Sequence, residues 1–384
     1  MNATLSTPHP SGQEVLGAAS SRELPAYLPW LDVLRFVACF LVIVQHSLPV
    51  GAGLLGHTGV ALFFSISGFL IGRILAANPM LPSFYARRFL RIYPAYIFTL
   101  ALFGLLAYTP FLHHPELGTL FWHNITYYLT FTYRLSPVSA QLPLVIVWSL
   151  CVEELFYFLL PLLFLLRNNR FVAVALVALV GVLLVPRFYL LPDGSGTWFL
   201  FPLNLLVGVL LALAKPRLLA SKSLARPMAA LSVALVAVAV MIADGITGWF
   251  HNFGLISAIL CTAAVWSLAT CPIRLPAILD PLRRMGMVSY GIYLLHFFCV
   301  PLAMRICGHL AGHPVVFRTA VVFLTTALSV VAASLMKKFV EDPPLRLRPL
   351  LKVHPKLMYT FAAIQVSFIP TGILLAIAAR RLHW

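Results

Sequence analysis

The sequence is short of charge, and above all of acidic residues. Lys, Arg, Asp and Glu together make up 10% of its 384 residues, whereas soluble domains carry roughly 25%. Only 11 residues are acidic, and the net charge is +16. Too little charge is present to cover a water-facing surface, which excludes a soluble globular enzyme, a disordered chain and a disulfide-rich secreted module. Because 61% of the residues are hydrophobic, lipid is the expected solvent of this chain.

The sequence also lacks paired cysteines and an N-terminal apolar segment. Its six cysteines form no CxxC pair, and we interpret them as small core residues. Residues 1–26 are rich in Ser, Pro, Ala and Gly and contain no apolar run of the kind that a signal peptide needs. We predict a flexible cytosolic tail over 1–26, a membrane domain over 27–384, and no appended soluble domain. We see no metal-ligand cluster and expect no metal.

Long apolar runs dominate the rest of the chain. A helix needs about 20 residues to cross a bilayer, and eleven runs approach this length. The sequence therefore predicts an all-α, polytopic membrane helix bundle with about 10–11 transmembrane helices. The sixth run is short, and the aromatic segment 120–133 is an interfacial or re-entrant candidate. The eleven runs are 28–48, 56–77, 92–112, 143–166, 171–191, 198–214, 227–244, 252–269, 287–307, 316–336 and 357–379.

Basic residues alternate between successive loops. The loops after even-numbered runs hold 18 Arg and Lys, whereas those after odd-numbered runs hold four. Because cytoplasmic loops are enriched in Lys and Arg, this asymmetry predicts a cytoplasmic N-terminus in the cytoplasmic (inner) membrane. Arg380 and Arg381, after the last run, are an exception.

Ionisable residues in two of the apolar runs stand out as functional candidates, because lipid excludes charges that serve no function. The first run holds Asp32, Arg35 and His46, and the fourth holds Glu153 and Glu154. Arg35 and His46 are eleven residues apart, so they share one helix face and lie about 16 Å apart along its axis. The structural alternatives are an Asp32–Arg35 ion pair with His46 at the outer interface, and a purely structural ion pair for the glutamates.

A basic cluster precedes the third run. Arg88 and Arg91 are three residues apart and share a helix face. With Arg73 and Arg87 they would form a basic mouth that binds the phosphates of an anionic ligand from the cytosol. The alternative is ordinary anchoring by cytoplasmic positive charge.

Three further features have structural interpretations. Gly68 and Gly72 form a small-xxx-small pattern, which favours close helix packing. His296 lies in the middle of the ninth run and is interpreted as a hydrogen-bonded packing histidine. The aromatic segment 121–134 suits either an interfacial belt or carbohydrate stacking.

Six motifs occur in one order along the chain. They are LDVLRFVACFLVIVQHS with Arg35 and His46, GVALFFSISGFLI, FYARRFLRIYPAY, WSLCVEELFYFLLPLLF, SYGIYLLHF and FVEDPP. Together they resemble the membrane acyltransferase-3 family from about Leu31 to Arg348. The chain departs from that pattern at Ala61, where the family often has an acidic residue, and at Leu155, where it often has glutamine.

This resemblance implies an enzyme that moves an acyl group from cytosolic acyl-CoA, most often acetyl-CoA, to a hydroxyl of a carbohydrate or glycosylated acceptor such as a surface polysaccharide. His46 would be the general base, and Arg35 would stabilise the oxyanion or orient the donor. Glu153 or Glu154 would pair with Arg35 or fix the imidazole tautomer. A covalent acyl-histidine relay is an equally valid variant.

The rival hypothesis is a proton-coupled transporter or flippase of a glycan or lipid-linked substrate, since such carriers also use intramembrane Arg, Glu and His. The third hypothesis is a scaffold protein that assists a polymer synthase. None of the three predicts a nucleic-acid partner. The acceptor, the acyl chain and the oligomeric state stay open.

Overall fold

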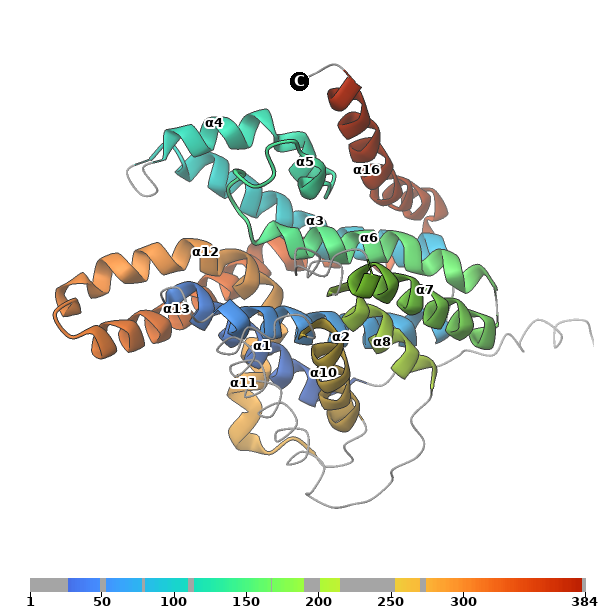
Figure 1. Cartoon of the computed structure of the whole chain (residues 1–384), viewed down its shortest axis with the longest axis horizontal. Helices are drawn as coiled ribbons and strands as arrows, with labels where there is room; N and C mark the ends of the chain where they lie inside the picture. Colours follow the sequence, from blue (N-terminus) through green and yellow to red (C-terminus); the bar gives the residue numbers. More distant parts are fainter. Residues whose placement is uncertain are drawn as a thin grey trace, which may run out of the picture.

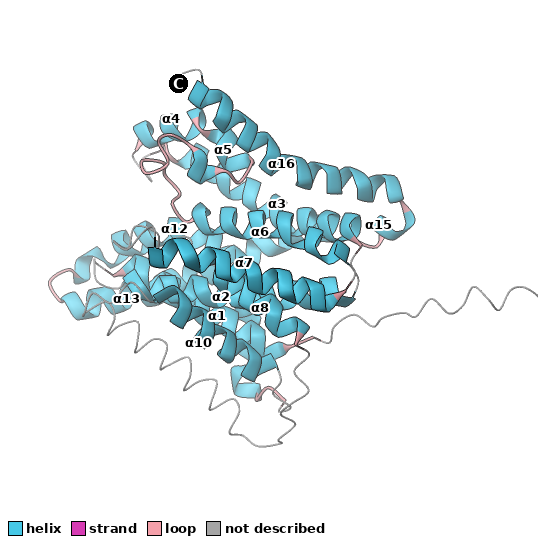
Figure 2. Cartoon of the chain, turned by 45° about the vertical axis from the view of Figure 1, so that its right-hand side comes forward, coloured by secondary structure: helices cyan, strands magenta, loops and turns pink. Residues whose placement is uncertain are grey.

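The protein is a bundle of α-helices, seen here in a computed structural model (Figure 1). The structure describes residues 27–48, 53–77, 80–109, 114–166, 168–189, 201–214, 253–269 and 274–381. Across these ranges every regular element is helical and no strand occurs (Figure 2). The predicted fold class is therefore confirmed.

Ten of the eleven predicted spans correspond to helices. Within the described ranges, seven helices are long and apolar enough to cross a membrane and three shorter ones are apolar, which identifies an integral, multi-pass membrane protein. The predicted span 227–244 and the predicted tail 1–26 lie outside the described residues. The helices are α1 (Pro29–Ser47), α2 (Gly53–Ala77), α3 (Leu81–Leu106), α6 (Val147–Leu163), α7 (Asn169–Tyr189), α8 (Phe201–Leu213), α10 (Phe253–Ala269), α12 (Ser289–Ile306), α13 (Pro314–Met336) and α16 (Pro355–Arg381).

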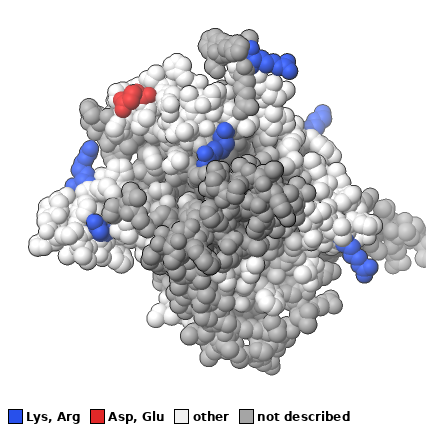
Figure 3. All heavy atoms as spheres, in the orientation of Figure 1, with Lys and Arg blue, Asp and Glu red and all other residues white. Residues whose placement is uncertain are grey.

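Short helices connect the long ones at both ends of the bundle. They are α4 (Pro115–His123), α5 (Ile125–Leu129), α11 (Asp280–Met287), α14 (Asp342–Leu345) and α15 (Leu350–Val353). The helices α1, α2, α8 and α10 pack together, α12 pairs with α13, and α16 packs on α3 (Figure 1). The face drawn in Figure 3 carries few charged side chains among the described atoms. Many large apolar side chains are exposed, including Val174, Phe323 and Leu374, as expected of a surface that meets lipid.

Close contact between α2 and α8 depends on glycine, as the small-xxx-small pattern predicts. A Cβ on Gly68 would lie 2.0 Å from the backbone oxygen of Leu205, so no larger residue fits without moving α8. A Cβ on Gly72 would meet the Ala212 side chain at 2.8 Å. The absence of side chains here allows the two backbones to approach.

Helices α1 and α12 lie side by side with a constant offset of 250 residues. The thiol of Cys39 donates to the backbone oxygen of Ser289 at 3.2 Å, and the rings of His46 and His296 meet at 3.1 Å. Along each helix the two contacts lie seven residues apart, which is about 10 Å. The two helices are therefore parallel and in register, which agrees with the shared orientation predicted for the first and ninth spans.

The aromatic segment after α3 forms α4, α5 and a compact turn. Its rings are mostly buried: Phe121 and Tyr128 are fully covered, and Phe131 stacks on Tyr96 with ring centroids 4.5 Å apart. Trp122 is the exception, with 45% of its surface exposed. This segment is thus part of the core, and its buried rings are not available as the platform for carbohydrate stacking that the sequence left open.

Candidate active site

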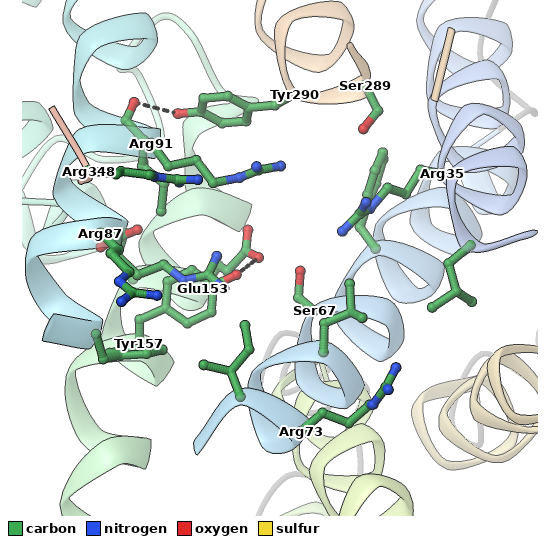
Figure 4. A pocket seen from close by; sticks show the side chains of 18 of the residues that line it. Arg35, Ser67, Arg73, Arg87, Arg91, Glu153, Tyr157, Ser289, Tyr290 and Arg348 are labelled. Carbon is green, nitrogen blue, oxygen red and sulfur yellow. Dashed lines mark hydrogen bonds between the residues drawn. The ribbon is translucent and has the colours of Figure 1, made fainter. Parts of the chain in front are cut away.

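A cavity of about 1050 Å³ opens among α1, α2, α3, α6, α12 and the segment 348–353. Seven cations and three carboxylates line it. The cations come from two sides, as Figure 4 shows: one group lies on and beside α3, and Arg35 and Arg73 lie opposite on α1 and α2. Such an arrangement suits a ligand with several negative groups. The cations are Arg35, Arg73, Arg87, Arg88, Arg91, Arg348 and Lys352.

All four residues of the predicted basic mouth line this cavity. Arg88 lies over the rings of Phe84 and Tyr157, with its guanidinium carbon 5.6 and 4.8 Å from their centroids. These faces orient the guanidinium by cation–π contact and leave its N–H donors available. Arg91 lies one helical turn further along α3, and Figure 4 shows it extending toward the opposite wall. In the described part of the chain, neither Arg88 nor Arg91 is in an ion pair.

The opposite wall is built around an ion pair that the sequence suggested as a structural alternative. Arg35 donates to Asp32 at 2.7 Å. Asp32 also accepts a hydrogen bond of 2.5 Å from Tyr27, whose pKa is raised by burial and by this contact. Close packing holds the backbone at Asp32, since a Cβ on Gly286 of α11 would lie 1.7 Å from the Asp32 backbone oxygen. Arg35 therefore lines the cavity with its single positive charge already paired with Asp32, and its remaining N–H donors are the groups it can offer to a ligand.

The contacts of the two glutamates in the structure differ from the contacts predicted for them. Glu153 accepts a hydrogen bond from the Tyr157 hydroxyl (Figure 4). Glu154 is 2% exposed and accepts a bond of 2.5 Å from the side-chain amide of Gln365 in α16. Neither carboxylate pairs with Arg35 or contacts His46 among the described residues. Both glutamates line the cavity and belong to its polar wall. Neither orients the His46 ring by a hydrogen bond among the described residues.

The partner of His46 is a second histidine. His46 Nδ1 lies 3.1 Å from Nε2 of His296, and His296 Nδ1 lies 2.6 Å from the backbone oxygen of Tyr293. A carbonyl only accepts, so His296 Nδ1 carries a proton and, in the neutral ring, its Nε2 is an acceptor. His46 Nδ1 must then donate, which leaves the lone pair of His46 Nε2 without a hydrogen-bond donor among the described residues. His296 is 1% exposed, whereas the His46 side chain lies at the surface of the described part of the protein.

The two histidines lie outside the lining of the basic cavity. Tyr293, Ser149 and Phe63 line its inner end, but neither His46 nor His296 is among the described residues that do so. The Tyr293 hydroxyl is held by Ser149 at 2.6 Å and by the backbone oxygen of Ile146 at 3.0 Å. The lining of this cavity thus includes Tyr293 but not the histidine pair. Tyr293 links the two places, because its side chain lines the cavity and its backbone oxygen accepts the hydrogen bond from His296.

Sequence reasoning missed several parts of this site. His296 was interpreted as a packing residue, although a histidine in the middle of a span is itself a signal of function. Arg348 and Lys352 were counted only as cytoplasmic charges, and no spacing linked them to α3. Arg35 lies about three helical turns from His46, so its position suits binding of the donor and not contact with an oxyanion beside His46.

The whole arrangement can be compared with known proteins. The model of a family described as an acyltransferase domain matches residues 28–334. The chain belongs to the acyltransferase 3 family. Relatives include the O-acetyltransferase OatA of Staphylococcus aureus, 28% identical over 360 residues, and the peptidoglycan O-acetyltransferase OatA of Listeria monocytogenes, 27% identical over 368 residues. A putative peptidoglycan O-acetyltransferase, YrhL of Bacillus subtilis, is 27% identical over 363 residues.

These matches cover 83% of this chain but only 55–57% of the three relatives. The chain thus spans little more than half the length of the curated relatives it matches. No solved structure matches it. The resemblance inferred from six short motifs is confirmed as family membership.

Proposed function

We propose that this protein is an O-acyltransferase that moves an acetyl group from cytosolic acetyl-CoA to a hydroxyl of a carbohydrate in the cell envelope. The names of the relatives support acetyl transfer and a peptidoglycan acceptor. The observation that carries the proposal is the His46–His296 pair, in which His46 Nε2 has a free lone pair. The protein would lie in the cytoplasmic membrane with its N-terminus inside.

The donor would bind in the basic cavity. CoA carries a diphosphate and a separate ribose phosphate, and cations on both walls would bind them through charge-assisted hydrogen bonds. Arg88 and Arg91 lie on the α3 wall, and Arg35 and Arg73 lie opposite. The pantetheine arm would then extend toward Tyr293. To reach His46, the thioester must pass the contact between the Tyr293 and Ser149 hydroxyls.

His46 would act as the general base. Its Nε2 takes the proton of the acceptor hydroxyl while the oxygen bonds to the thioester carbonyl carbon. The carbon–sulfur bond then breaks, and the thiolate recovers the proton from His46. Protonated His46 keeps its Nδ1–H bond to His296, whose Nε2 stabilises the imidazolium in the way that a carboxylate does in a hydrolase triad. In the covalent variant Nε2 attacks the thioester first, and the same tautomer serves.

Labelled donor and sided vesicles test the proposal. The protein is reconstituted in liposomes with acetyl-labelled acetyl-CoA sealed inside and peptidoglycan fragments added outside. We expect label to appear in the external glycan, and only when labelled acetyl-CoA is sealed inside the liposomes. The absence of acetyl transfer to any glycan, with donor and acceptor supplied on both sides, would overturn the proposal.

The same vesicles distinguish a carrier. Movement of unmodified glycan across the bilayer without transfer of label would support the transporter, which also has intramembrane Arg, Glu and His. No observation in the described part of the chain favours the carrier over the enzyme.

A further inference from the structure

One rim of the basic cavity comes from beyond the region that matches the family model. That region ends at residue 334, whereas Arg348, Pro349, Lys352 and Val353 line the cavity. This rim segment, residues 346–353, follows α13 and α14. Figure 4 shows Arg348 beside Arg91 and Arg87, on the same wall.

The rim segment is anchored to α3. Leu351 is 3% exposed and belongs to a small apolar cluster with Ala86 and Leu90. Bonds from backbone N–H groups to carbonyls three residues earlier keep the segment helical across this contact. Arg348 and Lys352 are four residues apart and so share a face beside Leu351. Anchoring at Leu351 therefore holds both cations at the cavity.

These two cations have no compensating acid. Neither is in an ion pair within the described residues. Arg348 is half-buried, and its Nε is a covered donor with no hydrogen-bond acceptor among the described groups. A covered donor without an acceptor is destabilising, unless a ligand supplies the acceptor. The rim thus has the properties of a phosphate site that is completed by its ligand.

We propose that Arg348 and Lys352 bind the ribose phosphate of the CoA donor, the phosphate on the nucleotide part of the molecule. This inference rests on the proposed function, since it assumes an acyl-CoA in the cavity. Lys352 lies on the rim segment, whereas Arg91 lies on α3 beside Tyr290 (Figure 4). The thioester must point inward toward Tyr293, so the nucleotide end stays at the rim and the diphosphate meets Arg88 and Arg91.

Binding of CoA and of dephospho-CoA, which lacks the ribose phosphate, tests this assignment. The purified protein in nanodiscs of zwitterionic lipid is expected to bind CoA about tenfold more tightly than dephospho-CoA. The double variant Arg348→Ala, Lys352→Ala should bind both equally, with the affinity for dephospho-CoA unchanged. Arg348→Lys should restore part of the preference. The matched control is Arg346→Ala, Lys356→Ala, because both of these cations are exposed and lie outside the cavity lining.

The outcomes separate this inference from the proposed function. A wild-type protein that binds neither ligand overturns both. Wild-type preference for CoA that persists in a folded Arg348→Ala, Lys352→Ala variant overturns the rim site alone. If that variant keeps the preference but loses thermal stabilisation by anionic lipid, the two cations bind a lipid headgroup and the inference is wrong.

Discussion

Replacing His296 tests the tautomer argument most closely. His296→Phe keeps a ring of similar size but removes Nε2, the acceptor 3.1 Å from His46 Nδ1. A hydrogen bond to a charged group contributes about 1.5–3 kcal/mol, and about 1.4 kcal/mol changes a rate tenfold. Loss of this bond as His46 becomes protonated should therefore lower kcat roughly ten- to 150-fold. His296 does not line the cavity, so the KM for acetyl-CoA should change by less than about twofold.

His296→Gln is the matched control, because its amide oxygen reaches about as far as Nε2 and also accepts a hydrogen bond. We expect it to retain kcat within about fivefold of the wild type. The assay is the transfer of labelled acetyl groups to a soluble glycan acceptor, with folding checked by thermal unfolding. An equal loss of kcat in both variants would indicate that His296 has only a packing role. A His296→Phe variant with the kcat of the wild type would refute the tautomer argument.

Three further predictions concern the donor cavity and the packing around it. Arg88→Ala should raise the KM for acetyl-CoA about ten- to hundredfold with little change in kcat, because a charge-assisted contact to phosphate is lost; a selective fall in kcat would contradict this. Gly68→Ala should lower the temperature of thermal unfolding, since overpacking costs about 1–3 kcal/mol, whereas Gly308→Ala should not, because nothing lies within 4 Å of its Cβ position; equal behaviour of the two would count against the tight α2–α8 contact. Gln365→Leu removes the donor to buried Glu154 and should destabilise the fold by about 1–3 kcal/mol; unchanged unfolding would show that α16 does not hold this carboxyl group.

Much of the fold could be predicted because lipid imposes simple rules. Apolar runs of bilayer length located ten helices, and the alternation of Arg and Lys gave α1 and α12 the same direction. The small-xxx-small pattern predicted the contact at Gly68. These signals are local, since each depends only on residues within one run or loop.

The partners within the site could not be predicted in the same way. Arg35 pairs with Asp32, a contact between residues three apart that the sequence already offered. By contrast, His46 meets His296 across 250 residues, and Glu154 meets Gln365 across 211. Such pairs depend on which helices are neighbours, and hydrophobic periodicity does not specify neighbours. The set of residues that lines the basic cavity, which includes Tyr293 but not His46, is likewise a property of packing.

The proposed function requires that His46 performs acyl transfer from a donor bound in the basic cavity. The variant His46→Ala tests this when acetyl transfer and CoA binding are both measured in the same reconstituted preparation. We expect transfer to glycan to be lost while the affinity for CoA stays at the wild-type value. Retention of acetyl transfer by a folded, membrane-inserted His46→Ala protein would contradict it.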